Sequence, residues 1–277
     1  MDKPAGLTSH DVVQRIRRVV RSRAVGHTGT LDPFATGLLV VLVGRATRLA
    51  RFVETQPKTY IATALLGIAT ETDDLTGEPV GEPYAGDALV RERVETALGA
   101  FQGAHEQRPP VYSAKHVDGQ RSYRVARRGG TVTPRPATVT VHRIDMIAYR
   151  WPEVVFRATV SAGTYLRAIA RDLGESLGTG AHLTTLRRES IGALRVEDAT
   201  PLAQVTGESV RPVRTVLGHL PVRELDEAGR LAVSHGRAME AGDAPDGDVA
   251  LVRGEELIAV ARAEDGWLKP SVVLGTP

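Results

Sequence analysis

Asp32 is the acidic side chain whose surroundings most favour chemistry. It lies in a turn rich in Gly, Thr and Pro, between a basic segment and the apolar run 38–43. A lone acid in such a turn is usually a helix cap or a turn former. In an active site, the same carboxylate could act as a nucleophile or remove a proton. An unperturbed Asp has a pKa of about 3.9, so Asp32 is expected to be ionised at pH 7.

Several other kinds of site lack the residues that they need. The chain has no Cys, which excludes disulfides, thiolate metal sites and a Cys nucleophile. Its eight His residues show no metal-ligand spacing, so no metal site is expected. No apolar run approaches about 20 residues, and the first residues lack the apolar stretch of a signal peptide. We therefore expect a cytoplasmic protein without a membrane span.

Charge and composition divide the chain into two predicted domains, residues 1–212 and 213–277. The net charge is +2, but the second part holds seven basic and eleven acidic residues, so the first part carries about +6. A basic body suggests a polyanionic partner. The acidic part has short apolar stretches at 231–233, 249–252 and 257–261, which suggest a small β-rich domain.

Hydrophobic periodicity predicts the elements of the larger domain. Residues 8–21 have the pattern of an amphipathic helix, with Thr8 and Asp11 as a capping box. Helices are also predicted for 87–103 and for the segment from Gly163 to Leu177. Strands are predicted for 38–43, 59–68, 139–144 and 154–160. Because strands and helices do not alternate strictly, the α+β class is favoured over a doubly wound sheet.

Six separated segments resemble, in order, the motifs of the bacterial TruB-type tRNA pseudouridine synthases. They are Lys3–Val13, Val25–Pro33, Lys58–Tyr60, Arg108–Ala114 with Gly119 and Tyr123, Gly163–Arg167, and Ala181–Arg188. The resemblance implies a mixed, largely antiparallel central sheet flanked by helices, and a C-terminal PUA-like domain that matches more loosely. The family has an apolar strand before its first motif, where only Met1 and Asp2 stand here. This departure concerns an edge of the sheet and not Asp32.

By this resemblance, the chain isomerises uridine to pseudouridine at position 55 in the T-arm loop of tRNA. Asp32 is then the catalytic aspartate, which either attacks the nucleotide or removes a sugar proton, and no cofactor is implied. Arg167 corresponds to the arginine partner that orients it, and its charge would lower the pKa of Asp32 by roughly 1–3 units. The alternative for Arg167 is an exposed position on a helix surface.

The target base must leave its stack to reach Asp32, which costs a few kcal/mol. Stacking on one aromatic ring returns about 1–3 kcal/mol, and the resemblance makes Tyr60 the candidate ring. Further substrate-binding candidates are Tyr165, His27 for the uptake of folded tRNA, Leu183 or Leu186 as an apolar wall, and Lys3. Each has a structural alternative. Tyr60 could be an ordinary strand tyrosine, His27 a loop histidine bonded to backbone, and the leucines core residues. Lys3 and also Lys58 could be structural lysines.

The basic stretch 115–128 is predicted to hold the T stem-loop through Arg121, Arg124, Arg127 and Arg128. A disordered charged linker is the alternative. Two other functions compete: an RNA-binding or RNA-folding protein on the same scaffold, and an aspartyl-nucleophile phosphotransferase. The latter needs a second acid two residues after Asp32, where the chain has Phe34. We expect a monomer with no obligate protein partner.

Overall fold

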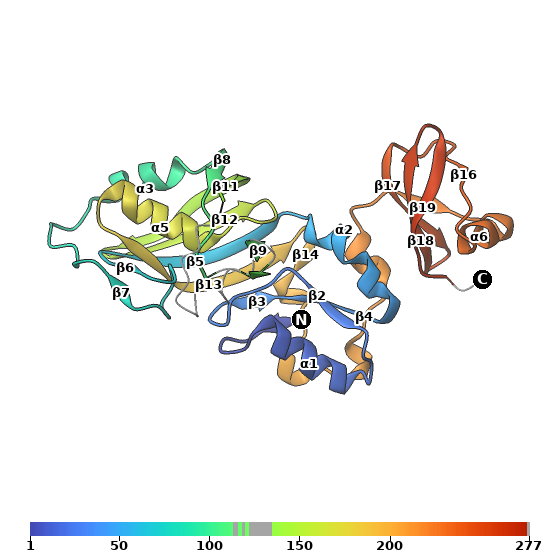
Figure 1. Cartoon of the computed structure of the whole chain (residues 1–277), viewed down its shortest axis with the longest axis horizontal. Coiled ribbons are helices and arrows are strands. Elements are labelled where there is room, and N and C mark those ends of the chain that lie inside the picture. Colours follow the sequence, from blue (N-terminus) through green and yellow to red (C-terminus); the bar gives the residue numbers. More distant parts are fainter. Residues whose placement is uncertain (113–115, 118–119, 122–134, 276–277) are drawn as a thin grey trace.

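The computed structural model describes residues 1–112, 116–117, 120–121 and 135–275. A larger α+β body and a smaller β-rich unit lie at the two ends of the molecule (Figure 1). The residues predicted to hold the T stem-loop fall mostly outside this description: Arg124, Arg127 and Arg128 are not in it, and only the backbone of Arg121 is.

The body is built on one sheet with the strand order β1-β3-β13-β5-β12-β11-β8, to which β14 adds on β13. Its strands are β1 (Asp2–Lys3), β3 (Thr36–Leu38), β5 (Lys58–Leu66), β8 (Gly103–Gln107), β11 (Ala137–Arg150), β12 (Glu153–Val160), β13 (Ala181–Ile191) and β14 (Leu194–Arg195). All neighbours are antiparallel except β3 and β13. The predicted α+β class with a mixed, largely antiparallel sheet is confirmed.

Short ladders and helices complete the body. The ladders are β2 (Val25–Thr28) with β4 (Val40–Val43), β6 (Ala69–Thr70) with β7 (Pro79–Val80), and β9 (His116–Val117) with β10 (Gln120–Arg121). The helices are α1 (Ser9–Val19), α2 (Ala50–Glu54), α3 (Arg91–Gly99) and α5 (Leu166–Leu177), and α3 and α5 lie on one face of the sheet (Figure 1). No helix of the described residues is long and apolar enough to cross a membrane.

The predicted capping box of α1 is confirmed. The Asp11 amide donates to Thr8 Oγ1 (3.0 Å), and the Thr8 amide donates to Asp11 Oδ2 (2.9 Å). The predicted helix 87–103 is too long, because α3 begins only at Arg91 and Gly103, with a φ of +108°, already belongs to β8.

The predicted strand 38–43 is divided in two at Leu39. The Leu39 amide donates to the Met1 carbonyl (2.9 Å), which keeps this residue beside β1, whereas Val40–Val43 pair with β2. The chain thus leaves the central sheet at a fully buried leucine. β1, of two residues, is the edge strand on this side of the sheet.

The small unit has a five-stranded sheet, ordered β15-β17-β18-β19-β16. Its elements are β15 (Val222–Glu224), α6 (Glu227–Ser234), β16 (Met239–Glu240), β17 (Gly247–Arg253), β18 (Glu256–Glu264) and β19 (Trp267–Val273). The β-rich character is confirmed, but the stretch 231–233 is helical because Asp226 caps α6 through the Gly229 amide (2.7 Å). The predicted boundary at residue 212 stays a prediction.

The two units share an apolar contact. Leu49 and Phe52 of the body pack in one buried cluster with Leu217 and with Val260 of β18. Arg48 Nη1 also donates to the Val273 carbonyl (2.7 Å). The main core lies elsewhere, between the central sheet and α1, α3 and α5, and one of its edges borders the site described next.

Candidate active site

A cleft of about 240 Å³ opens where the turn after β2 meets β5, β13 and the start of α5. Its lining includes six residues that could act on a ligand: Asp32, Lys58, Tyr60, Tyr165, Arg167 and Arg188. They come from four separate stretches of the chain. The fold therefore brings together Asp32, Tyr60, Tyr165 and Arg167, four of the residues that the sequence singles out.

The turn that carries Asp32 is held by the first segment of the chain. Ser9 Oγ accepts from the Leu31 amide (2.9 Å) and donates to the Leu31 carbonyl (3.2 Å). The Gly6 amide donates to the Pro33 carbonyl (2.8 Å). Leu31 is itself buried. Bonds on both sides of Asp32 thus fix the backbone from which its carboxylate projects.

Arg167 contacts the carboxylate of Asp32 at two points. The distances are 3.1 Å from Nη2 to Oδ1 and 3.0 Å from Nε to Oδ2. The Arg167 side chain is 4% exposed, whereas that of Asp32 is 31% exposed and so still faces the cleft. The alternative of an exposed helix arginine is wrong for Arg167. A two-point contact restricts the carboxylate to one orientation.

A second acid, Asp74, holds the opposite side of the same guanidinium. Arg167 Nη1 lies 3.2 Å from Asp74 Oδ2 and donates to the Thr72 carbonyl (2.8 Å). Asp74 Oδ1 in turn accepts from the Thr72 hydroxyl (2.8 Å) and the Thr76 hydroxyl (2.6 Å). Asp74 has no distinguishing signal in the sequence, because a Thr- and Asp-rich segment is typical of an ordinary turn until the fold packs it on α5.

The electrostatic balance at Asp32 corrects one expectation. The pKa of Asp32 is raised from its ordinary value, chiefly by burial and further by the nearby charge of Asp74. Arg167 and Lys3 act in the opposite direction but do not outweigh burial. Arg167 does lower the pKa as predicted, but the net shift is upward, because burial outweighs the effect of Arg167. Arg167 orients the carboxylate and also opposes its protonation.

Tyr60 lies on β5, with Arg188 of β13 beside it. The tyrosine is 7% exposed, and the guanidinium carbon of Arg188 lies 6.0 Å from its ring centroid. Arg188 is buried, and it donates to the carbonyls of Leu38 (2.7 Å) and Gly29 (3.0 Å). It therefore ties the turn that carries Asp32 to the wall of the cleft. Arg188 lies within the motif Ala181–Arg188, but its role could not be predicted from the sequence.

The parallel pairing of β3 with β13 depends on Gly37. Its φ is +101°, and a Cβ there would lie 2.3 Å from the Arg188 carbonyl oxygen. Any other residue would push the two strands apart and displace Arg188. Gly37, five residues after Asp32, is thus required by packing.

Tyr165 precedes α5 and is held by Gln107, the last residue of β8. The Tyr165 amide donates to Gln107 Oε1 (2.8 Å), and Gln107 Nε2 donates to the Tyr165 carbonyl (3.1 Å). Gln107 is buried. Its polar side chain in the sequence gave no sign that it would support Tyr165. This exchange fixes the start of the helix that carries Arg167.

Three other candidates lie away from the open cleft. Lys3 is fully buried and donates to the carbonyls of Pro4, Leu7 and Pro33 (3.0, 2.7 and 3.3 Å), and burial lowers its pKa to about 8. Leu183 is fully buried in the core, whereas Leu186 lines the cleft. His27 lies on β2, outside the described lining.

Lys58 lines the cleft, but its ammonium faces backbone. It donates to the carbonyls of Glu54 and Gln56, each at 2.8 Å, and burial lowers its pKa to about 8. Among the described residues, no group of three His, Cys, Asp or Glu side chains could hold a metal ion.

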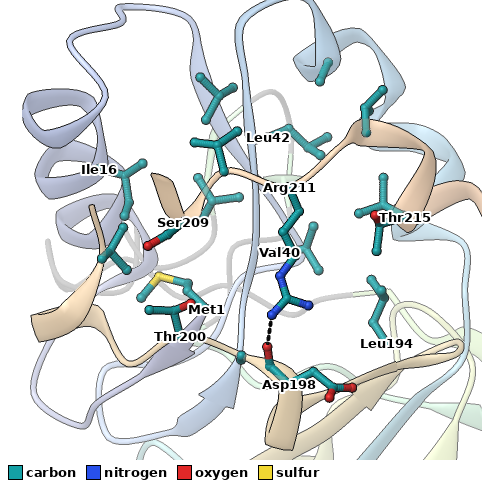
Figure 2. Close-up of a pocket in the computed structure, with 18 of the residues that line it drawn as sticks. Met1, Ile16, Val40, Leu42, Leu194, Asp198, Thr200, Ser209, Arg211 and Thr215 are labelled. Atoms are coloured by element: carbon teal, nitrogen blue, oxygen red, sulfur yellow. Dashed lines mark hydrogen bonds between the residues drawn. The ribbon is translucent and has the colours of Figure 1, made fainter. Parts of the chain in front are cut away.

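A larger pocket, of about 490 Å³, lies between α1, β4 and the segment 193–216. Figure 2 shows Ile16, Val40 and Leu42 around it, with Arg211 donating to the Asp198 carbonyl (2.8 Å). Its lining is mainly aliphatic, and neither Asp32 nor Arg167 reaches it. We therefore place the chemistry in the smaller cleft.

Comparison with known proteins assigns the family. Residues 17–166 match the TruB family pseudouridylate synthase N-terminal domain, and residues 167–217 match the tRNA pseudouridylate synthase B C-terminal domain. The chain is 43% identical to tRNA pseudouridine synthase B of Thermobifida fusca, covering 99% of this chain and 96% of that protein. It is 42% identical to the protein of the same name from Gloeobacter violaceus, covering 100% and 98%.

Solved structures share the fold. The archaeal box H/ACA sRNP Nop10–Cbf5 complex contains a chain that superposes with a TM-score of 0.75 at 23% identity, covering 99% of this chain and 85% of that one. Full-length similarity, a shared fold and matched domains agree with the motifs around Asp32. The chain belongs to the TruB family of pseudouridylate synthases.

Proposed function

We propose that this protein converts uridine to pseudouridine in tRNA, at position 55 of the T-arm loop. The two-point contact of Arg167 with Asp32, at the wall of a cleft that also holds Tyr60, is the observation that carries the proposal. Binding alone requires no carboxylate aimed toward a polyanion. The relatives named tRNA pseudouridine synthase B support tRNA as the substrate.

The isomerisation is balanced within the nucleotide. The bond between N1 of uracil and C1′ of ribose breaks, the base turns, and a bond forms between C5 and C1′. The hydrogen on C5 is released, and N1 takes up a proton. Asp32 starts the reaction as an ionised carboxylate, either by attack on the nucleotide or by removal of a sugar proton. No step in this balance requires a cofactor.

The base enters the cleft by leaving its stack, and the ring of Tyr60 is the stacking surface. The arginines of the first helix and the turn after it supply phosphate contacts. Arg15, Arg18, Arg21 and Arg23 are exposed, whereas Arg17 donates to the Val25 carbonyl (3.1 Å). We therefore propose that the protein acts on the T stem-loop as a monomer.

The test is tritium release from tRNA that carries 5-tritiated uridine. We expect the wild-type protein to release label from tRNA with uridine at position 55 and to release none when that uridine is replaced by cytidine. Equal release of label from the two tRNAs would contradict the assignment to position 55. Tight binding without release would instead favour an RNA-folding protein.

A further inference from the structure

Helix α5 carries a second arginine one turn after Arg167, and the two make matching contacts. Arg167 pairs with Asp74 (3.2 Å) and donates to the Tyr112 carbonyl (3.0 Å). Arg171 pairs with Asp73 (3.1 Å) and donates to the Arg108 carbonyl (2.9 Å). Residues four apart on a helix lie on the same face. Each arginine therefore joins one of two consecutive acids to one end of the segment 108–112.

The acids stand on a fixed support. The Leu183 amide of β13 donates to the Asp73 carbonyl (3.0 Å), and the Leu75 amide donates back to the Leu183 carbonyl (2.8 Å). Asp73 has a φ of +59°, a left-handed conformation that these bonds hold in place. The turn 70–76 is thus fastened to the central sheet, and Arg171 is fastened to the turn.

The segment 108–112 has little conformational freedom at its centre. Its second and third residues are Pro109 and Pro110, both buried, and proline fixes φ near −65°. Consecutive prolines form a semi-rigid spacer. A displacement of the Arg108 carbonyl therefore limits where the Tyr112 carbonyl can lie.

We propose that Arg171 is a positioning residue for the Asp32–Arg167 pair. It holds the Arg108 end of the segment 108–112, and so fixes the Tyr112 carbonyl that shares Nη2 of Arg167 with Asp32. The activity that this residue supports is the proposed function above. The effect on the segment itself does not depend on that function.

The charges around Asp73 support this role. Arg171, Arg167 and Asp172 of α5 face Asp73, and burial raises the pKa of Asp73 to about 6. Arg171 also contacts Asp172 (2.8 Å). A buried carboxylate with this much desolvation would be poorly tolerated without its cation. The position of Arg171 is therefore set by Asp73 as well as by the helix.

The first experiment measures the segment directly. Backbone order parameters of Val111 and Tyr112 from NMR relaxation are compared in wild-type protein and in Arg171→Gln, with Arg157→Gln as the control. Arg157 lies on β12 in a half-exposed ion pair with Glu189. We expect the order parameters of both residues to fall from about 0.85 toward about 0.6 in Arg171→Gln and to stay unchanged in the control. Unchanged order parameters in Arg171→Gln would overturn the proposal.

The second experiment measures coupling to the reaction. We expect Arg171→Gln to lower kcat by roughly tenfold with KM for tRNA within about threefold, since small misplacements of catalytic groups reduce turnover steeply. Arg171→Lys, which cannot reach both Asp73 and the Arg108 carbonyl, should recover only part of the loss. Pro110→Ala should also lower kcat, and the double variant should lose less than the product of the two effects.

Thermal unfolding separates this role from simple loss of structure. A variant that is less stable but keeps the wild-type kcat, or two effects that multiply fully, would refute the proposal. An inactive wild-type protein would refute the proposed function instead, and the order parameters of Val111 and Tyr112 would still decide the role of Arg171.

Discussion

The guanidinium of Arg167 contacts both carboxylate oxygens of Asp32, through Nη2 at 3.1 Å and Nε at 3.0 Å. Asp74 occupies the far side of the same group. Arg167 is thus a buried cation between two carboxylates, one of them half open to the cleft. This arrangement gives Asp32 a defined orientation while burial raises its pKa.

Asp32→Asn is expected to abolish tritium release and to leave the affinity for tRNA within several-fold. The amide keeps the shape of the side chain but can neither attack nor accept a proton as a base. Turnover and filter binding would be measured on the same preparation. Asp145→Asn, at an exposed position of β11 in contact with Arg143, is the matched control. Wild-type turnover in Asp32→Asn would end the proposed role.

Arg167→Lys is expected to lower kcat by roughly 10²-fold, because a single ammonium cannot reproduce the two-point contact. Arg167→Gln should also reduce the free energy of unfolding by about 3–5 kcal/mol, since it leaves buried Asp74 without its cation. Urea unfolding would check the second value. Arg157→Gln, which removes a half-exposed pair, should cost no more than about 1 kcal/mol. Equal losses in the two glutamine variants would contradict this view.

Tyr60→Phe should keep most of the turnover, whereas Tyr60→Ala should lose far more. The ring supplies stacking of about 1–3 kcal/mol per base, and the hydroxyl lies 3.5 Å from Arg188 Nη1, at the limit of a hydrogen bond. Because Tyr60 is buried, the alanine variant also leaves a cavity. Turnover would therefore be compared at a temperature where thermal scans show each variant folded. Similar losses in both variants would remove the stacking role.

Asp73 should make the protein less stable as the pH rises from about 4 to 6. Its pKa is about 6 in the folded protein against an ordinary value of 3.8, so unfolding releases a proton within this window. Each unit of difference corresponds to about 1.4 kcal/mol, which gives a loss of up to about 3 kcal/mol. The contribution of Asp73 to the free energy of unfolding is fully present below about pH 4. It is lost as the pH rises to about 6. In Asp73→Asn, this part of the pH dependence of urea unfolding should disappear. An unchanged profile would show that Asp73 titrates normally.

The affinity for tRNA should fall steeply with added salt, because phosphate contacts release counterions. Arg15→Gln combined with Arg18→Gln should reduce the slope of log affinity against log salt by about 2. Arg262→Gln, at an exposed position of β18 in the acidic unit, is the control and should leave the slope unchanged. A slope that is flat in the wild type would exclude the arginines of α1 as main contacts.

Much of the fold could be predicted from local pattern. The capping pair Thr8 and Asp11 marked the start of α1, and the alternation around Val154–Val160 predicted β12. These features depend on neighbours a few positions apart, so the printed sequence contains them. Asp32 could be selected because its turn resembles a known motif, which also supplied Arg167 and Tyr60 as its companions.

Other features depended on contacts between distant segments. The strand β13 was missed because its charged stretch includes Arg188, which is buried only where the carbonyls of Leu38 and Gly29 receive its donors. Asp74 and Arg171 had no local signal either. The net direction of the pKa shift at Asp32 could not be predicted either, because desolvation depends on everything that packs around the group.

The sequence alone determined which residues could do the chemistry and which local elements carry them, because side-chain type and periodicity are properties of short stretches. The resemblance already named Arg167 as the partner of Asp32, 135 positions away. Only the tertiary structure decided that Arg167 contacts Asp32 at two points and Asp74 on its other side. That outcome depends on the register of strands far apart in the chain and on how much water their packing excludes.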